Sequence, residues 1–131
     1  MTIERVTTGK ALEKTMLHGP GVIASGRTLH TSGIVARDDD GNVVGIGDMA
    51  AQLEQIWRNL ADILEAAGAT GADFSRVVKF TIYVTDMDEY LRVRDISNPY
   101  YIDKPAATLV EVSRLASPEM MVEIEAIVAL D

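Results

Sequence analysis

The strongest constraint on the fold is one amphipathic stretch in the middle of the chain. From Asp48 to Ala67, apolar residues recur with the 3.6-residue period of an α-helix and form a single stripe. Asp48 is a typical N-cap, and Gly68 is typical of the position just past a helix end. A helix with one apolar stripe must bury it, so we expect the flanking segments to supply a sheet.

The segments around this helix alternate apolar and polar residues as strands do. The patterns predict strands over 21–25 and 28–35, joined as a hairpin at Gly26-Arg27, and further strands over 74–84, 107–114 and 122–130. A second helix is predicted to begin at Asp86, where Glu89 completes a capping box. Asn98-Pro99 predicts a kink or break in it.

The element order is therefore β-β-α-β-α-β-β, which indicates an α+β domain with two helices packed on one face of a mixed sheet. A length of 131 residues fits one domain spanning 1–131. No element remains to cover the helix-free face of the sheet, so we expect the chain to form an oligomer.

Charge and composition exclude several classes of partner. The chain has 12 basic and 20 acidic residues, a net charge of −8, which argues against nucleic acid and against anionic membrane surfaces. It has no cysteine and two histidines, so we expect no disulfide, no thiolate site, no metal and no cofactor. No signal-like or membrane-spanning apolar run is visible, and we interpret the protein as cytoplasmic. The acidic run 38–40 lacks the alternation of a calcium loop and is interpreted as a solvated turn.

Two carboxylates share one face of the last strand. Glu123 and Glu125 are two residues apart, which places them about 7 Å from each other on a strand. Such a pair suits acid–base chemistry. The same alternation is more common on a strand that simply faces solvent. Both interpretations, an acid–base pair and a solvent-facing strand, stay open.

The C-terminal part resembles a known family signature. Residues 105–115 read Pro-Ala-Ala-Thr-Leu-Val-Glu-Val-Ser-Arg-Leu and residues 122–127 read Val-Glu-Ile-Glu-Ala-Ile. This block is similar to the signature of the RidA/YjgF family of imine and enamine deaminases, some of which are named L-PSP endoribonucleases. Segments 31–33, 50–52, 65–68 and 78–86 extend the resemblance. It implies a chorismate-mutase-like fold and a homotrimer that binds a small-molecule ligand in clefts between subunits.

The resemblance also implies roles for individual residues. Glu123 matches a glutamate that positions water or substrate and is the candidate catalytic residue. Gly33 matches a glycine whose backbone faces the ligand, and Tyr90 matches an aromatic residue that lines the cleft. Glu123 has an alternative role as a structural carboxylate held by backbone N–H groups of a neighbouring subunit.

One position departs from the family pattern. Deaminating members carry an arginine directly after Pro-Ala, where it forms a two-pronged salt bridge with the substrate carboxylate; here the residue is Ala107. Ala107 is expected to face the cleft with Glu123 nearby. Lys104 in the preceding loop is a candidate replacement, although a lysine offers a point charge and not a fork. Arg114 falls on the opposite face of its strand, and Arg94 is interpreted as a helix-end or surface charge.

Three functions are compatible with these observations. The first is hydrolysis of an imine, enamine or related C–N bond in a substrate without the usual carboxylate contact, with Glu123 and a bound water transferring protons. The second is noncatalytic binding of a small molecule or a trimeric interaction role. The third, an endoribonuclease or translation inhibitor, is disfavoured by the acidic charge.

Overall fold

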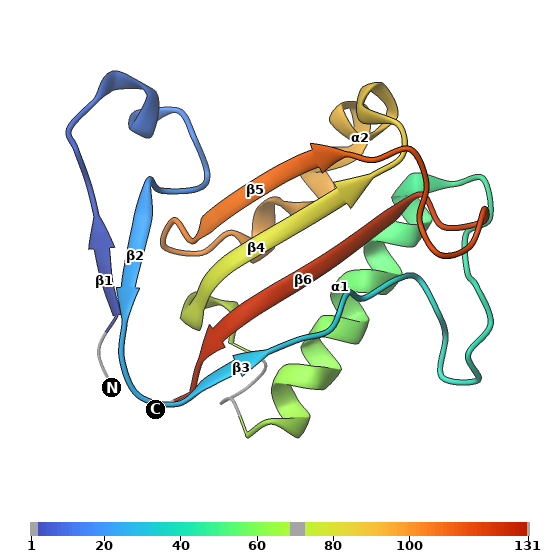
Figure 1. Cartoon of the computed structure of the whole chain (residues 1–131), viewed down its shortest axis with the longest axis horizontal. Helices are drawn as coiled ribbons and strands as arrows, with labels where there is room; N and C mark the ends of the chain where they lie inside the picture. The colour runs from blue at the N-terminus through green and yellow to red at the C-terminus, as the bar shows by residue number, and fades with distance from the viewer. Residues whose placement is uncertain (1–2, 69–72, 131) are drawn as a thin grey trace.

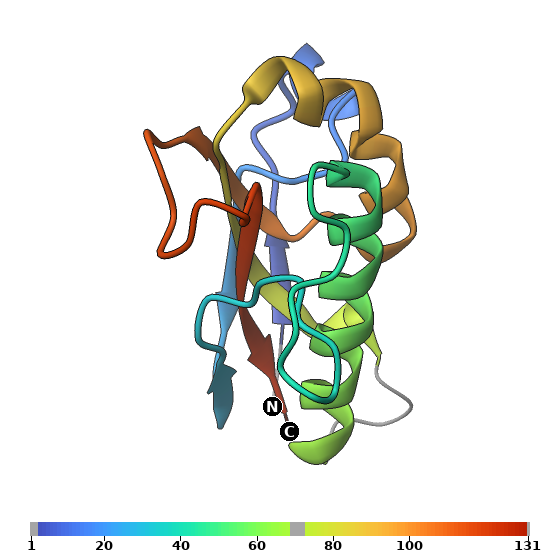
Figure 2. The same cartoon turned by 90° about the vertical axis from the view of Figure 1, so that its right-hand side faces the viewer.

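In the computed structural model, which describes residues 3–68 and 73–130, helices pack on one face of a four-stranded sheet (Figures 1 and 2). The strand order is β3-β6-β4-β5; β4 and β5 run parallel and the other neighbours antiparallel. The strands are β3 (Thr28–His30), β4 (Val77–Val84), β5 (Ala106–Glu111) and β6 (Val122–Ala129). This confirms the predicted α+β class with helices on one face of a mixed sheet.

The central helix α1 (Met49–Ala66) has the predicted ends. The Asp48 carboxylate accepts a hydrogen bond from the Ala51 N–H at 3.1 Å, and Gly68 adopts a φ of 85° just past the end. The predicted stripe is buried against the sheet and the neighbouring helices; it comprises Met49, Leu53, Ile56, Trp57, Leu60 and Leu64. The indole of Trp57 stacks on Tyr100 with ring centroids 4.4 Å apart, which ties α1 to the segment after the second helix.

The two faces of the sheet differ sharply in polarity. On β6, Val122, Ile124 and Val128 are buried toward the helices, whereas Glu123 and Glu125 lie half-buried on the other face. This alternation is as predicted, because successive strand residues point to opposite faces. Within the described residues no helix covers the second face (Figure 2).

The predicted hairpin is wrong, although both of its strands form. The chain turns at Gly26, where φ is +89°, but it passes there from one sheet to another (Figure 1). Strand β2 (Gly21–Ala24) pairs with β1 (Ile3–Val6), a strand the sequence reading did not anticipate, and β3 pairs with β6. Pairing choices of this kind depend on distant segments, and the local turn signal carries no information about them.

The predicted strand over 28–35 is interrupted. Regular pairing stops at His30 and resumes only as an isolated bridge between Ile34 and Ile124. The Thr31 hydroxyl accepts from the Ala126 N–H at 2.9 Å and takes the place of a ladder bond. Gly33 lies in this irregular stretch, as a glycine inside a strand pattern suggests.

The second helix, α2 (Met87–Val93), begins at the predicted cap but ends early. The Asp86 carboxylate accepts from the Glu89 N–H at 3.1 Å, while the Glu89 carboxylate pairs with Arg92 at 2.6 Å and does not complete the capping box. From Arg94 the chain tightens into a 3₁₀ helix, η4 (Arg94–Tyr100), so the break comes before the predicted Asn98-Pro99. Arg94 thus starts a new element.

The remaining segments complete the molecule. Two short 3₁₀ helices, η1 (Ala11–Lys14) and η3 (Phe74–Arg76), precede β2 and β4, so β4 begins three residues later than predicted. Strand β5 also ends three residues early, at Glu111. The acidic run forms a turn in which the Asp38 carboxylate accepts two backbone N–H groups, at 3.0 Å each. Over the residues described, no helix has the length and apolar character needed to cross a membrane.

Candidate functional site

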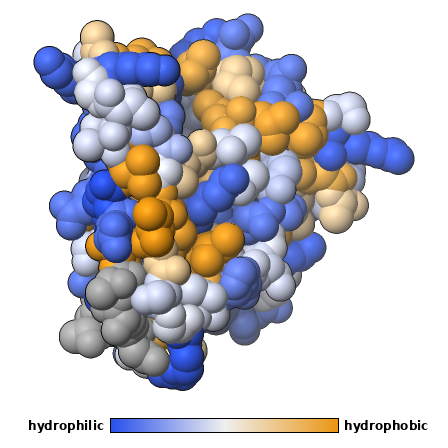
Figure 3. All heavy atoms as spheres, turned by 60° about the vertical axis from the view of Figure 1, so that its left-hand side comes forward, coloured by the Kyte–Doolittle hydropathy of each residue, from blue (hydrophilic) through white to orange (hydrophobic). Residues whose placement is uncertain are grey.

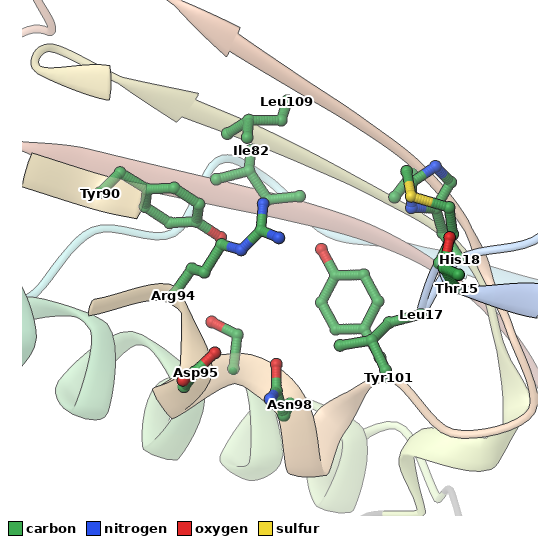
Figure 4. A pocket seen from close by; sticks show the side chains of 13 residues that line it. Thr15, Leu17, His18, Ile82, Tyr90, Arg94, Asp95, Asn98, Tyr101 and Leu109 are labelled. Atoms are coloured by element: carbon green, nitrogen blue, oxygen red, sulfur yellow. The ribbon is translucent and has the colours of Figure 1, made fainter. Parts of the chain in front are cut away.

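A cavity of about 430 Å³ lies between the sheet and the second helix (Figure 4). Its walls come from β4 and β5 on one side, α2 and η4 on the other, and the loop before β2. The lining residues are Thr15, Met16, Leu17, His18, Ile82, Tyr90, Arg94, Asp95, Ser97, Asn98, Tyr101, Ala107 and Leu109. A volume of this size suits a small molecule.

The sheet wall of the cavity is apolar. Ala107 pairs with Phe80 in the parallel β4–β5 ladder, and Leu109 pairs with Ile82. Phe80 and Ile82 are buried toward the helices, so Ala107 and Leu109 point to that same side. The small side chain of Ala107 offers no polar group to a ligand here.

Two tyrosines line the helix side of the cavity. Tyr90 comes from α2 and Tyr101 follows η4, and both phenol groups point into the cavity (Figure 4). Burial raises the pKa of Tyr90 and that of Tyr101 above the ordinary tyrosine value. Both hydroxyls therefore stay protonated at neutral pH and can donate hydrogen bonds.

A hydrogen-bond chain anchors Tyr90 to the core. The Trp57 indole N–H donates to the Ser97 hydroxyl at 3.0 Å. The Ser97 hydroxyl in turn bonds to the Tyr90 side chain and lowers its pKa, although desolvation outweighs this effect. The buried Trp57–Ser97 pair therefore helps to hold Tyr90 in place at the cavity.

Arg94 is an exposed residue at the end of α2, as its interpretation as a helix-end or surface charge predicted, and it also lines this cavity. Its guanidinium lies between the hydroxyls of Tyr90 and Tyr101 (Figure 4), and its charge lowers the pKa of both phenols against the larger effect of burial. Across residues 3–68 and 73–130, no carboxylate lies within ion-pair distance of it. The four-residue spacing from Tyr90 was a signal that could have placed both side chains on one helical face.

Glu123 and Gly33 form a second cluster, on the opposite face of the sheet. The Glu123 side chain packs so closely on Gly33 that a Cβ atom at position 33 would come within 2.7 Å of Glu123 Cδ. The neighbouring Glu125 accepts a hydrogen bond from the Tyr83 hydroxyl at 2.7 Å, which raises the pKa of Tyr83. Glu123 has no hydrogen-bond partner among the residues that the structure describes.

The predicted site residues therefore fall into three places. Tyr90 and Ala107 line the cavity, Gly33 and Glu123 meet on the other face of the sheet, and Lys104 lies outside both. Within one chain Ala107 and Glu123 lie on opposite faces of the sheet, because Ala107 shares the side of Phe80 and Glu123 the side of Tyr83. That they are neighbours in a cleft between subunits stays a prediction.

Lys104 lies outside the cavity. Its ammonium group donates to the backbone carbonyls of Glu13 and Met16, the latter at 2.9 Å. It thereby fastens the loop before β2 to the start of β5. In this structure the lysine shapes the cavity wall without contributing charge to the cavity.

Comparison with known proteins places this architecture in a family. The family model described as Endoribonuclease L-PSP matches residues 9–130. The chain belongs to this family. It is 36% identical over 106 residues to a RutC family protein of Pyrococcus horikoshii, an alignment that covers 80% of this chain and 81% of the relative.

Solved structures agree with this assignment. A Rid family protein of unknown function from Yersinia pestis, YyfB, matches with a TM-score of 0.87 and 31% identity, covering 99% of this chain and 100% of that one. The YjgF gene product of E. coli matches with a TM-score of 0.68 and 28% identity, covering 97% and 93%. The RidA/YjgF resemblance and its chorismate-mutase-like fold are confirmed.

Proposed function

We propose that this Rid family chain hydrolyses an imine, enamine or related C–N bond of a small metabolite, in a cleft formed between copies in a homotrimer. The observation that carries the proposal is the separation of two half-sites on opposite faces of one sheet. One half is the cavity with Tyr90 and Ala107, and the other is Glu123 against Gly33. If the open sheet face of one copy packs against the cavity of the next copy, the two half-sites meet in one cleft.

The open face has the properties that such an assembly needs. No helix covers it within the described residues. Exposed apolar side chains, Val110 on β5 and Ile23 on β2 among them, lie outside the core, and Figure 3 shows hydrophobic side chains gathered in patches on one side of the molecule. β5 is also an edge strand of the four-stranded sheet. A closed threefold ring would cover such surfaces.

The chemistry requires one well-placed carboxylate. Hydrolysis of an imine adds water across C=N to give a carbinolamine, which then expels ammonia and leaves a carbonyl group. Glu123 is suited to accept a proton from the attacking water and to return it to the leaving nitrogen. Its carboxylate has no partner in the described chain that would compete for that proton. Because residue 33 has no side chain, the Glu123 carboxylate can lie directly against its backbone.

A second candidate is ligand binding without turnover. Ala107 favours it, because the arginine that holds substrates in deaminating relatives is absent from that position. The ribonuclease activity named in the family description has less support, since a net charge of −8 opposes binding to a phosphate backbone.

Turnover of imines tests the proposal. Imines released in situ by amino acid and amine oxidases are supplied to the chain, and their decay and the release of ammonia are followed. We expect faster decay with the parent and a loss of about a hundredfold or more with Glu123→Gln. Glu125→Gln, on the same face but hydrogen-bonded to Tyr83, is the matched control and keeps the parent rate. No acceleration with any imine would favour the binding protein.

A further inference from the structure

The sheet wall of the cavity carries no cation, since residue 107 is alanine, whereas the helix wall carries the guanidinium of Arg94. Ala107 stands on β5, and Arg94 reaches in from the start of η4 (Figure 4). We propose that Arg94 is the residue that binds the ligand's anionic group, so that the cavity takes a small monocarboxylate with an apolar body. This inference rests on the proposed function, because it assigns a substrate class to the same cavity.

The charge of Arg94 is not neutralised by its surroundings. The described chain places no carboxylate within ion-pair distance of the guanidinium. Asp95 lines the same cavity, yet it forms no ion pair with Arg94. Tyr90 and Tyr101, whose hydroxyls lie on either side of the guanidinium in Figure 4, remain neutral because burial raises their pKa values. A guanidinium in this setting gains most from a ligand that brings its own negative charge.

The hydrogen-bond donors around Arg94 match a carboxylate. The guanidinium offers a planar fork of N–H groups, and the phenols of Tyr90 and Tyr101 lie on either side of it (Figure 4). Both phenols stay protonated at neutral pH, because burial raises their pKa values, and each can donate a hydrogen bond to a ligand. A carboxylate has two oxygens with about four lone pairs, and donors from three side chains can satisfy them together.

The rest of the cavity specifies the remainder of the ligand. Opposite Arg94 the wall is formed by Ile82, Ala107 and Leu109, which favour an apolar body. The carboxylate of Asp95 on the same side as Arg94 disfavours a second negative charge. A short, singly charged oxo acid or imino acid therefore fits better than a dicarboxylate.

Equilibrium binding tests the inference without requiring turnover. Isothermal titration calorimetry of the assembled protein uses 2-oxobutyrate, its uncharged amide and 2-oxoglutarate as probes. We expect 2-oxobutyrate to bind more tightly than the amide or 2-oxoglutarate. Arg94→Met should weaken the binding of 2-oxobutyrate by about tenfold to a hundredfold, since a charge-assisted contact is lost. The affinity for the amide should stay unchanged. The affinity of Arg94→Lys for 2-oxobutyrate should lie between that of the parent and that of Arg94→Met.

Arg92→Met is the matched control. Arg92 is exposed two residues away and pairs with Glu89 outside the cavity, so its loss should change neither probe. A double variant, Arg94→Met with Ala107→Arg, should regain affinity for 2-oxobutyrate, because it moves the cation to the opposite wall. The unfolding midpoint and the oligomeric state of every variant are compared with those of the parent.

The outcomes separate this inference from the proposed function. Equal affinity of the parent and Arg94→Met for 2-oxobutyrate, or no binding of it by the parent at millimolar concentration, would overturn the role of Arg94 while leaving imine hydrolysis by Glu123 open. Affinity that depends on Arg94 in a protein that hydrolyses no imine would support the role and defeat the enzyme proposal.

Discussion

The substitution Gly33→Ala offers a way to move the Glu123 carboxylate without removing it. A Cβ atom at residue 33 would lie within 2.7 Å of Glu123 Cδ and 3.1 Å of Cγ, and closer still to Oε2. All of these atoms belong to the flexible end of one side chain. Gly33 does not have a positive φ, so alanine fits its backbone. The carboxylate must therefore swing aside by about 1 Å, a displacement that can reduce catalysis about a hundredfold.

The effect on stability should be small. An off-rotamer glutamate costs about 0.5–1.5 kcal/mol, and replacing glycine with alanine recovers about 0.4–1 kcal/mol from the unfolded chain. We expect the free energy of unfolding to change by less than about 1 kcal/mol, which shifts the midpoint by no more than about 4 °C.

Circular dichroism melting and imine decay, measured on the same preparations, provide the assay. Gly21→Ala is the control, because a Cβ at Gly21 meets only Val6 at 3.8 Å in the β1–β2 sheet. Parent-like turnover by Gly33→Ala would refute the reasoning that the position of Glu123 matters. A midpoint lowered by more than about 10 °C would show that the clash falls on the fold and not on one side chain.

Three further predictions follow from the hydrogen bonds. Ser97→Ala removes the acceptor of the buried Trp57 indole N–H and should destabilise the chain by about 1–3 kcal/mol in urea unfolding. The buried amide of Gln52 donates to two backbone carbonyls and accepts from one backbone N–H, and Gln52→Leu leaves all three groups without this partner. We expect the free energy of unfolding to fall by about 2–5 kcal/mol in urea unfolding. Hydrogen bonds, chiefly from Thr8, lower the pKa of Glu13 from 4.5 to about 2, so its stabilising effect should disappear as pH falls between those values; unfolding midpoints of Glu13→Gln should lack this part of the pH dependence.

Features set by neighbouring residues were predictable from the sequence. The ends of α1 follow from Asp48 and Gly68, and its buried stripe follows from the 3.6-residue period. The two faces of β6 follow from strict alternation through Glu123 and Glu125. Both patterns are local and survive folding because burial reinforces them.

Features set by distant segments were not predictable from the sequence. The hairpin prediction failed because β2 found its partner in β1 and β3 found its partner in β6, far along the chain. The break after α2 was expected at Asn98-Pro99, but the chain changes to η4 already at Arg94. That Ala107 and Glu123 face opposite sides requires the β4–β5 and β4–β6 registers, which alternation within one strand cannot supply.

The most direct test of the proposed site asks whether its halves come from different copies. Glu123→Gln removes the carboxylate and Ala107→Trp fills the cavity, so each variant alone should be inactive toward imines. The two are refolded together in equal amounts, and mass spectrometry verifies that mixed trimers form. If each site joins the cavity of one copy to Glu123 of the next, random assembly leaves about a quarter of the sites intact, and about a quarter of the parent rate should return. Mixed trimers that stay inactive would contradict a shared site.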